Sequence, residues 1–274
     1  MSQIHPEIGF IGFFDILGYS QIMLHNNIHK TSQFVSDTLM NIPKDLIGRL
    51  RGLYNSASDE TLEGRPYDSA EWQRMLDNIQ WIIFSDSILI SMPMSPGLDT
   101  LSQANLYLAF SKVCATLLNQ TFLAGFPLRG GISIGEFFIE DRCFAGRPII
   151  NAYRVAQELE MSGAVLDENA DAFVSKLRRT LVQNQYTESL SRLDQTTILY
   201  IPPTKTDEIE RARAINWVNL DQIGFEPFID NIRDVTLRAF LMHNKIAVPS
   251  VQGKINNTEM FIRHVLTNLQ ETNK

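Results

Sequence analysis

Two aspartates stand in strongly apolar stretches of the sequence, and their carboxylates are the first candidates for chemistry. Asp15 lies within the run FFDIL, and Asp86 lies between the runs IIF and ILI. Either residue alone is usually a turn or capping residue. A charge in such surroundings is costly, however, unless it is paired or bound to a metal ion. If the two carboxylates meet, they form a hard oxygen site suited to Mg²⁺ or Mn²⁺, which can assist an in-line displacement at phosphorus.

The segments that carry these aspartates predict a fold that brings them together. The expected elements are a buried strand over 8–16 that leads into a helix, a hairpin over 79–92 with Ser85-Asp86-Ser87 at its turn, a long helix over 101–122, and a pair of short strands over 128–138. This order predicts an α+β fold built on a ferredoxin-like βαββαβ palm. In that topology the end of the first strand and the hairpin turn lie side by side, so Asp15 and Asp86 become neighbours.

The rest of the chain predicts additional strands and helices around this palm. We expect a helix over 31–53 despite Pro43, an exposed loop over about 55–72, a loop over 140–146, a helix over 148–161 with Asn151, Arg154 and Glu158 on its polar face, strands over 197–201 and 214–220, and helices over 229–245 and 258–269. The predicted organisation is one domain over 1–222 and a C-terminal helical extension over 223–274 that packs on it.

Composition and charge exclude several classes of protein. The 274 residues include 24 Lys and Arg against 31 Asp and Glu, a net charge of -7 without a basic cluster, which argues against a general nucleic-acid-binding protein. With only Cys114 and Cys143, a disulfide framework is excluded and a cytoplasmic location is expected. The start MSQIHPEIGF lacks the features of an export signal, and no apolar stretch approaches the roughly 20 residues that span a bilayer, so we expect no membrane association.

Four motifs together resemble the class III nucleotidyl cyclases. FFDILGYS is similar to the family's opening signature, FSDSILIS to its second metal-aspartate hairpin, PLRGGISIGEFF to its Arg-x-Gly-Ile-x-x-Gly strand, and GRPIINAYRVAQELE to the helix that carries its transition-state residues. The motifs occur in the family's order and extend from Phe13 to Glu160. The resemblance implies that residues 1–222 are the cyclase catalytic domain.

The resemblance also implies catalytic roles for individual residues. Asp15 and Asp86 would hold two divalent metal ions, Mn²⁺ or Mg²⁺, with the carbonyl of Ile16 as a further ligand. Arg129 matches the arginine that contacts the polyphosphate. Arg154 matches the arginine that stabilises negative charge at the α-phosphate. In this family the metal aspartates and the helix arginine come from opposite subunits, so a homodimer with sites at the subunit interface is implied.

The helix motif departs from the family pattern at one position. Aligned from Gly146 without a gap, Ile150 stands where the partner asparagine belongs and Asn151 stands one place later, which leaves the role of Asn151 open. The residues implied in nucleotide binding are Phe14, Gly18, Tyr19, Ile82, Cys143 and Asn151.

The positions that read the base differ from those of purine cyclases. Adenylate and guanylate cyclases place polar residues four positions before the second metal aspartate and three before the helix glycine, and here these are Ile82 and Cys143. An apolar residue at the first position removes the group that reads the purine edge, and polar readout is where discrimination is largest. With Ser85 in place of a glycine, the sequence resembles the pyrimidine cyclases of the Pycsar anti-phage systems. We favour UTP as substrate and cyclic UMP as product, sensed by a separate effector protein, with CTP and cyclic CMP as the alternative.

Two other functions share part of this pattern. A catalytically silent cyclase homologue that binds a nucleotide is favoured by the missing asparagine at Ile150, and is opposed by the retention of two costly aspartates. A diguanylate cyclase or polymerase palm has the same expected fold but requires a Gly-Gly-Asp/Glu-Glu-Phe turn, which Ser85-Asp86-Ser87 is not.

Overall fold

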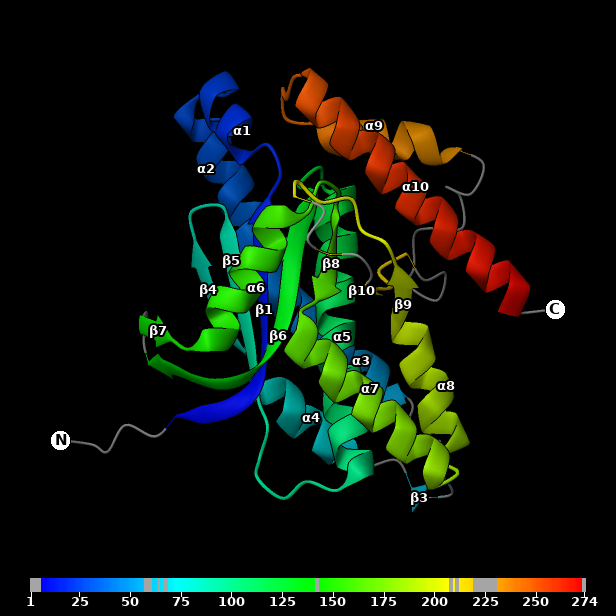
Figure 1. Ribbon diagram of the computed structural model, residues 1–274. Coiled ribbons are helices and arrows are strands. Elements are labelled where there is room, and N and C mark those ends of the chain that lie inside the picture. Colours follow the sequence, from blue (N-terminus) through cyan, green and yellow to red (C-terminus); the bar gives the residue numbers. More distant parts are fainter. Residues whose placement is uncertain are drawn as a thin grey trace.

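The computed structural model describes residues 6–56, 61–63, 65–66, 69–140, 143–206, 209, 212–218 and 231–272. One mixed sheet has the strand order β4-β5-β1-β6-β8-β10-β9, and β7 pairs with β6 beside this path (Figure 1). Its strands are β1 (Glu7–Ile16), β4 (Gln80–Phe84), β5 (Ser87–Pro93), β6 (Leu128–Glu140), β7 (Cys143–Ala145), β8 (Gly163–Leu166), β9 (Thr197–Tyr200) and β10 (Ala212–Ile215). A separate short hairpin pairs β2 (Thr61–Leu62) with β3 (Arg65–Pro66).

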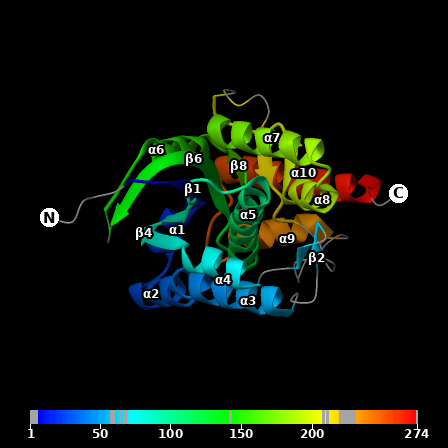
Figure 2. The ribbon, with the colours of Figure 1, turned by 90° about the horizontal axis from the view of Figure 1, so that it is seen from below.

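Helices lie on both faces of this sheet. They are α1 (Tyr19–His25), α2 (Ile28–Phe34), a π-helix (Val35–Met40), α3 (Ile42–Ser56), α4 (Ser69–Asp77), α5 (Thr100–Leu123), α6 (Arg147–Glu158), α7 (Glu168–Gln183), α8 (Thr187–Thr196), α9 (Ile232–Leu241) and α10 (Pro249–Thr272). Seen from below, α6 lies on one side of β1 and β6, and α2, α3 and α4 lie on the other side (Figure 2). The protein is therefore α+β, as the sequence predicts.

The predicted βαββαβ palm is confirmed by the strand pairing. β1 pairs antiparallel with β5 on one side and with β6 on the other, and β4 completes the hairpin with β5. The helix α6 then connects β6 to β8, which run parallel to each other. This topology puts the C-terminal end of β1 next to the turn between β4 and β5.

Side chains of β1 alternate between two hydrophobic layers, because successive residues of a strand point to opposite faces. Phe10 points to the larger core and stacks on Phe110 of α5 at 5.3 Å between ring centroids. Phe13 points to the smaller layer under α6, where it meets Tyr153 edge to face at 5.2 Å. Asp15 is two residues after Phe13 and therefore lies on the same α6 face.

Two glycines of β6 allow close approach from these two layers. A Cβ on Gly131 would lie 2.2 Å from the carbonyl oxygen of Ala152, so the backbone of α6 rests directly on the strand. A Cβ on Gly130 would lie 2.5 Å from the ring of Phe14, which occupies the space above it on the other face. Both glycines thus serve packing within the palm.

Several predicted elements differ from those observed. Residues 128–138 belong to one long strand, β6, rather than two short ones, and residues 143–145 of the predicted loop form β7. The helix expected over 31–53 is divided into α2, the π-helix and α3, and the predicted loop over about 55–72 contains β2, β3 and the start of α4. The strand β8 and the helices α7 and α8 were not predicted.

The C-terminal helices α9 and α10 contribute to the main core. Ile255, Phe261 and Val265 of α10 are fully buried, and Phe261 packs against Tyr200 and Trp217. The predicted domain boundary at residues 222 and 223 lies outside the described residues. Within the described part of the chain, no helix is both long and apolar enough to cross a membrane.

Candidate active site

The end of β1 and the β4–β5 turn bring Asp15 and Asp86 side by side. Asp15 is opposite Ser87 in the strand register, and the amide of Ile16 donates to the carbonyl oxygen of Asp86 at 2.9 Å. Ser85, the other residue of the turn, adopts a positive φ of 55°, which lets the hairpin reverse direction in two residues. The neighbouring positions predicted for the two aspartates are therefore confirmed.

The carboxylate of Asp15 forms a nearly buried ion pair with Arg129. Asp15 and Arg129 are opposite each other in the pairing of β1 with β6, and both side chains are 12% exposed. The Nε and Nη2 groups of Arg129 donate to the same oxygen, Oδ2, at 2.9 and 2.7 Å. Among the residues that the structure describes, the other oxygen of Asp15, Oδ1, has no hydrogen-bond partner.

Gln157 of α6 holds the same guanidinium from the other side. Nη2 of Arg129 donates to the Gln157 side-chain oxygen at 2.7 Å, and Nη1 donates to its backbone carbonyl at 3.1 Å. The ammonium of Lys205 donates to that same carbonyl, so two cations converge on Gln157. Sequence reasoning missed Gln157 and Lys205, because only the crossing of α6 over β6 places them beside Asp15.

Asp86 lies at the more open side of this edge. Its carboxylate has no hydrogen-bond partner in the described part of the chain. Burial, and then the nearby charge of Asp86, raise the pKa of Tyr19 above its usual value. Gly18 precedes Tyr19 with a φ of 80° and starts α1 there, so the predicted nucleotide-binding residues Gly18 and Tyr19 lie next to the two aspartates.

The two carboxylates fit a divalent ion that takes its other ligands from a substrate. The described residues contain no group of three or more His, Cys, Asp and Glu side chains able to hold a metal ion by themselves. Mg²⁺ and Mn²⁺ are commonly held by one or two carboxylates, with substrate phosphates and water filling the remaining positions. Asp15 with its free Oδ1, Asp86 and the carbonyl of Ile16 are the groups that could hold such an ion.

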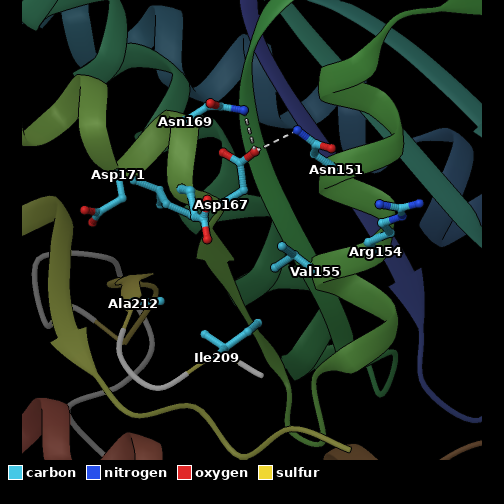
Figure 3. Close-up of a pocket in the computed structure, with 10 residues that line it drawn as sticks. Asn151, Arg154, Val155, Asp167, Asn169, Asp171, Ile209 and Ala212 are labelled. Atoms are coloured by element: carbon cyan, nitrogen blue, oxygen red, sulfur yellow. Dashed lines mark hydrogen bonds between the residues drawn. The ribbon is translucent and has the colours of Figure 1, made fainter. Parts of the chain in front are cut away.

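Two of the three residues predicted on the polar helix face, Asn151 and Arg154, line a cavity on another side of α6. Asn151, Arg154 and Val155 of α6 border a cavity of about 540 Å³ between α6 and the start of α7 (Figure 3). The side chain of Arg154 forms no ion pair with any described residue. It is therefore available to a ligand or to another subunit.

Asn151 is fixed by Asp167, the residue that caps the N-terminus of α7. The buried carboxylate of Asp167 accepts a hydrogen bond from Ser133 at 2.7 Å. It also accepts one from the amide nitrogen of Asn151 at 3.3 Å (Figure 3). Because a carboxylate can only accept, the Asn151 amide must turn its nitrogen to Asp167 and its oxygen away. Asp167 was not predicted, since its role depends on the parallel pairing of β8 with β6.

Phe14 and Cys143, which are also predicted to bind the nucleotide, do not face the Asp15 carboxylate. Phe14 is fully buried in the core on the α5 face, because it alternates with Asp15 along β1, so its side chain cannot contact a ligand on the α6 face. Cys143 is exposed on β7 opposite Glu140, roughly 35 Å along β6 from Arg129 at about 3.3 Å per residue. Within one chain the Phe14 side chain is turned away from the Asp15 face and Cys143 is separated from the aspartates, so their roles in nucleotide binding stay predictions.

Several large apolar side chains of β4 and α6 are exposed. Ile82 and Phe84 are two residues apart in β4 and therefore both lie on the α6 side of the sheet. Phe84 is 75% exposed. Ile150 and Tyr153 of α6 are 53% and 46% exposed. Exposed apolar side chains beside a polar site often mark an interface.

Comparisons with known proteins give a likeness in fold only. No protein-family model matches the sequence, and no curated protein matches it. Among solved structures, the adenylyl cyclase CyaB from P. aeruginosa is similar with a TM-score of 0.43 and 10% identity, over 78% of this chain and 96% of that chain. The guanylyl cyclase Cya2 is similar with a TM-score of 0.37 and 10% identity, over 77% of this chain and 92% of that chain. Both identities are too low to assign a function.

Proposed function

We propose that the protein is a pyrimidine nucleotide cyclase that converts UTP into cyclic UMP and pyrophosphate, as the signal-producing enzyme of an anti-phage defence system. The observation that carries the proposal is the convergence of Asp15, Asp86 and Arg129 at one edge of a βαββαβ palm. A non-enzymatic protein gains little from two aspartates held together in apolar surroundings. The apolar Ile82 at the first base-reading position supports a pyrimidine over a purine substrate.

The residues of this edge fit the electrostatic needs of phosphoryl transfer. Asp15 and Asp86 would bind the metal ions, which supply charge neutralisation and acidify the ribose 3′-hydroxyl. Arg129 would bind the leaving phosphates, and Arg154 would meet the negative charge that develops at the α-phosphate. Lys205, next to Arg129 on Gln157, adds a second positive charge for the polyphosphate.

We place the complete site between two copies of the chain. Asp15 and Asp86 lie at the ends of β1 and β4, whereas Arg154 lines the cavity between α6 and α7. The exposed apolar face beside Asp15 is suited to a second copy, which would bring its own Arg154 to the metal edge. The product would act through a separate effector protein that binds the cyclic nucleotide.

Turnover with each nucleoside triphosphate tests the proposal. Purified protein with Mn²⁺ and each of ATP, GTP, CTP and UTP should yield cyclic UMP from UTP, identified by chromatography and mass. Cyclic CMP as the main product would support the alternative substrate, and a purine product would contradict the pyrimidine assignment. If none of the four triphosphates yields a cyclic nucleotide, cyclase activity is refuted.

Substitution of the metal aspartates provides the residue-level test. Asp15→Ala and Asp86→Ala should each abolish turnover and remove the thermal stabilisation by Mn²⁺, since the metal loses a ligand. Asp234→Ala, at an exposed aspartate in the first turn of α9, is the matched control and should retain both. A silent homologue would instead bind nucleotide with Mn²⁺ and form no product in the wild type.

A further inference from the structure

Most of the Arg129 guanidinium is engaged in hydrogen bonds within the chain. Four of its five guanidinium N–H groups donate hydrogen bonds, two to Oδ2 of Asp15 and two to Gln157. Both members of the ion pair are 12% exposed, so water screens their attraction only weakly. Most of its donors are therefore unavailable to a phosphate while this pair is intact.

The same pair limits the access of a metal ion to Asp15. A divalent cation at Asp15 would lie within a few ångströms of the Arg129 charge, and like charges at that distance in a poorly hydrated site repel strongly. Release of Arg129 without a new anion would leave a buried cation unpaired, which is also costly. Neither the metal ion nor the triphosphate alone thus satisfies both groups.

We propose that the metal ion and the triphosphate enter this site together, with Asp15 and Arg129 exchanging partners, and that Gln157 is the positioning residue that holds Arg129 against Asp15 until the exchange. The inference rests on the proposed function. In the exchange Asp15 gives up the guanidinium for the metal ion, and Arg129 gives up the carboxylate for a phosphate. Each buried charge therefore keeps an opposite charge beside it. Binding of metal and triphosphate is then positively coupled, and the coupling is reciprocal.

The affinity for Mn²⁺ without a nucleotide tests this exchange directly. Arg129→Gln removes the competing cation and keeps hydrogen-bonding capacity, so Mn²⁺ alone should bind about tenfold or more tightly to the variant than to the wild type. Free Mn²⁺ is measured by its electron paramagnetic resonance signal during a titration. Arg178→Gln is the matched control, because it makes the same change of charge at an exposed ion pair with Asp194, and its Mn²⁺ affinity should equal that of the wild type.

A second variant guards against loss of folding in Arg129→Gln. Gln157→Leu removes one hydrogen bond to Arg129 and leaves the ion pair, so we expect Mn²⁺ alone to bind about threefold more tightly. In the wild type, thermal stabilisation by Mn²⁺ and inorganic triphosphate together should exceed the sum of their separate effects. If neither variant binds Mn²⁺ more tightly, the exchange is wrong. Additive stabilisation by the two ligands would also contradict it.

Asp15→Asn separates failure of this inference from failure of the proposed function. If Mn²⁺ binding with inorganic triphosphate is unchanged in Asp15→Asn, Asp15 is not a metal ligand, and the proposed function falls together with the inference. If Asp15→Asn abolishes Mn²⁺ binding but Arg129→Gln leaves it unchanged, only the exchange is refuted. Inorganic triphosphate carries no base, so neither outcome depends on the choice between UTP and CTP.

Discussion

Among single residues, Lys245 has a buried side-chain ammonium, although lysine is normally exposed to water. Its side chain is 7% exposed, and its ammonium donates to the carbonyl oxygens of Gly125 at 2.6 Å and Ala239 at 3.0 Å. Burial lowers the pKa of Lys245 from 10.5 to about 7. His243, which lies nearby, has its pKa lowered chiefly by burial and further by the charge of Lys245.

This burial predicts that stability increases with pH above 7. Between pH 7 and 10.5 the unfolded chain keeps the Lys245 proton and the folded chain releases it, so the free energy of unfolding rises by up to about 1.4 kcal/mol per pH unit. Lys245→Met should remove this rise. Chemical denaturation at pH 7, 8 and 9 measures it, with the exposed Lys176→Met as control. Parallel pH profiles for wild type and Lys245→Met would contradict the prediction.

At the residue scale the sequence predicts the candidate aspartates but not their partners. The apolar residues around Asp15 and Asp86 mark them as costly charges, and the palm topology places them together. The contact of Arg129 with Asp15 depends on the register between β1 and β6, and the contact with Gln157 depends on the angle at which α6 crosses β6. Neither quantity is contained in a local sequence pattern.

At the scale of elements, the close contact between α6 and β6 positions much of the candidate site. α6 carries Gln157 and Arg154, and it rests on Gly131 without room for a side chain. Gly131→Ala should lower the free energy of unfolding by about 1–3 kcal/mol, because the new methyl group must displace the helix backbone. It should also reduce turnover, since Arg154 moves with α6. Thermal or urea unfolding and initial rates provide the two measurements.

Gly253→Ala is the matched control for this substitution. Gly253 lies inside α10, and a Cβ there would have no atom within 4 Å. The same chemical change should therefore raise stability by about 0.5–1 kcal/mol through the better helix propensity of alanine. Equal effects of the two substitutions would show that α6 does not rest on Gly131 as described.

The elements that sequence analysis missed share a physical reason. β1 and the β4–β5 hairpin contain long Ile- and Phe-rich runs that are typical of strands, and both are confirmed. β8 has only four residues, all buried, which is too short for a periodic pattern. Gly130 and Gly131 interrupt the apolar run of β6 and therefore favoured two short strands. From the sequence, a glycine that ends a strand cannot be distinguished from one that makes room for a group of another element, such as Phe14 or Ala152 here.

On the scale of the whole molecule, the acidic chain gathers cations at one end of its sheet. The net charge is -7, yet Arg129 and Lys205 meet at Gln157 beside Asp15. A single polyphosphate needs only such local charges, together with metal ions, and not a basic surface. The apolar side chains of Phe84, Ile150 and Tyr153 are exposed, which is the kind of surface that a second copy of the chain could cover.

A shared site between two copies predicts rescue by mixed subunits. Asp15→Ala and Arg154→Ala should each be inactive as homodimers, because every site lacks one group. When the two variants are co-expressed, half of the dimers contain one chain of each kind. One of the two sites in such a dimer is intact. About a quarter of the wild-type turnover should therefore return, if subunits pair at random in a twofold symmetric dimer. Sedimentation velocity should show a dimer in every sample.

The control for this rescue uses two substitutions on the same side of the site. Asp15 and Asp86 belong to the same edge of one chain, so a mixed dimer of Asp15→Ala and Asp86→Ala has one aspartate missing from each site and should stay inactive. If Asp15→Ala with Arg154→Ala also stays inactive while dimers form, Arg154 acts within its own chain or not at all. If both mixtures regain turnover, activity has another source than the paired aspartates. The two sides of the site are assigned to different subunits if the mixture of Asp15→Ala with Arg154→Ala regains turnover and the mixture of Asp15→Ala with Asp86→Ala does not.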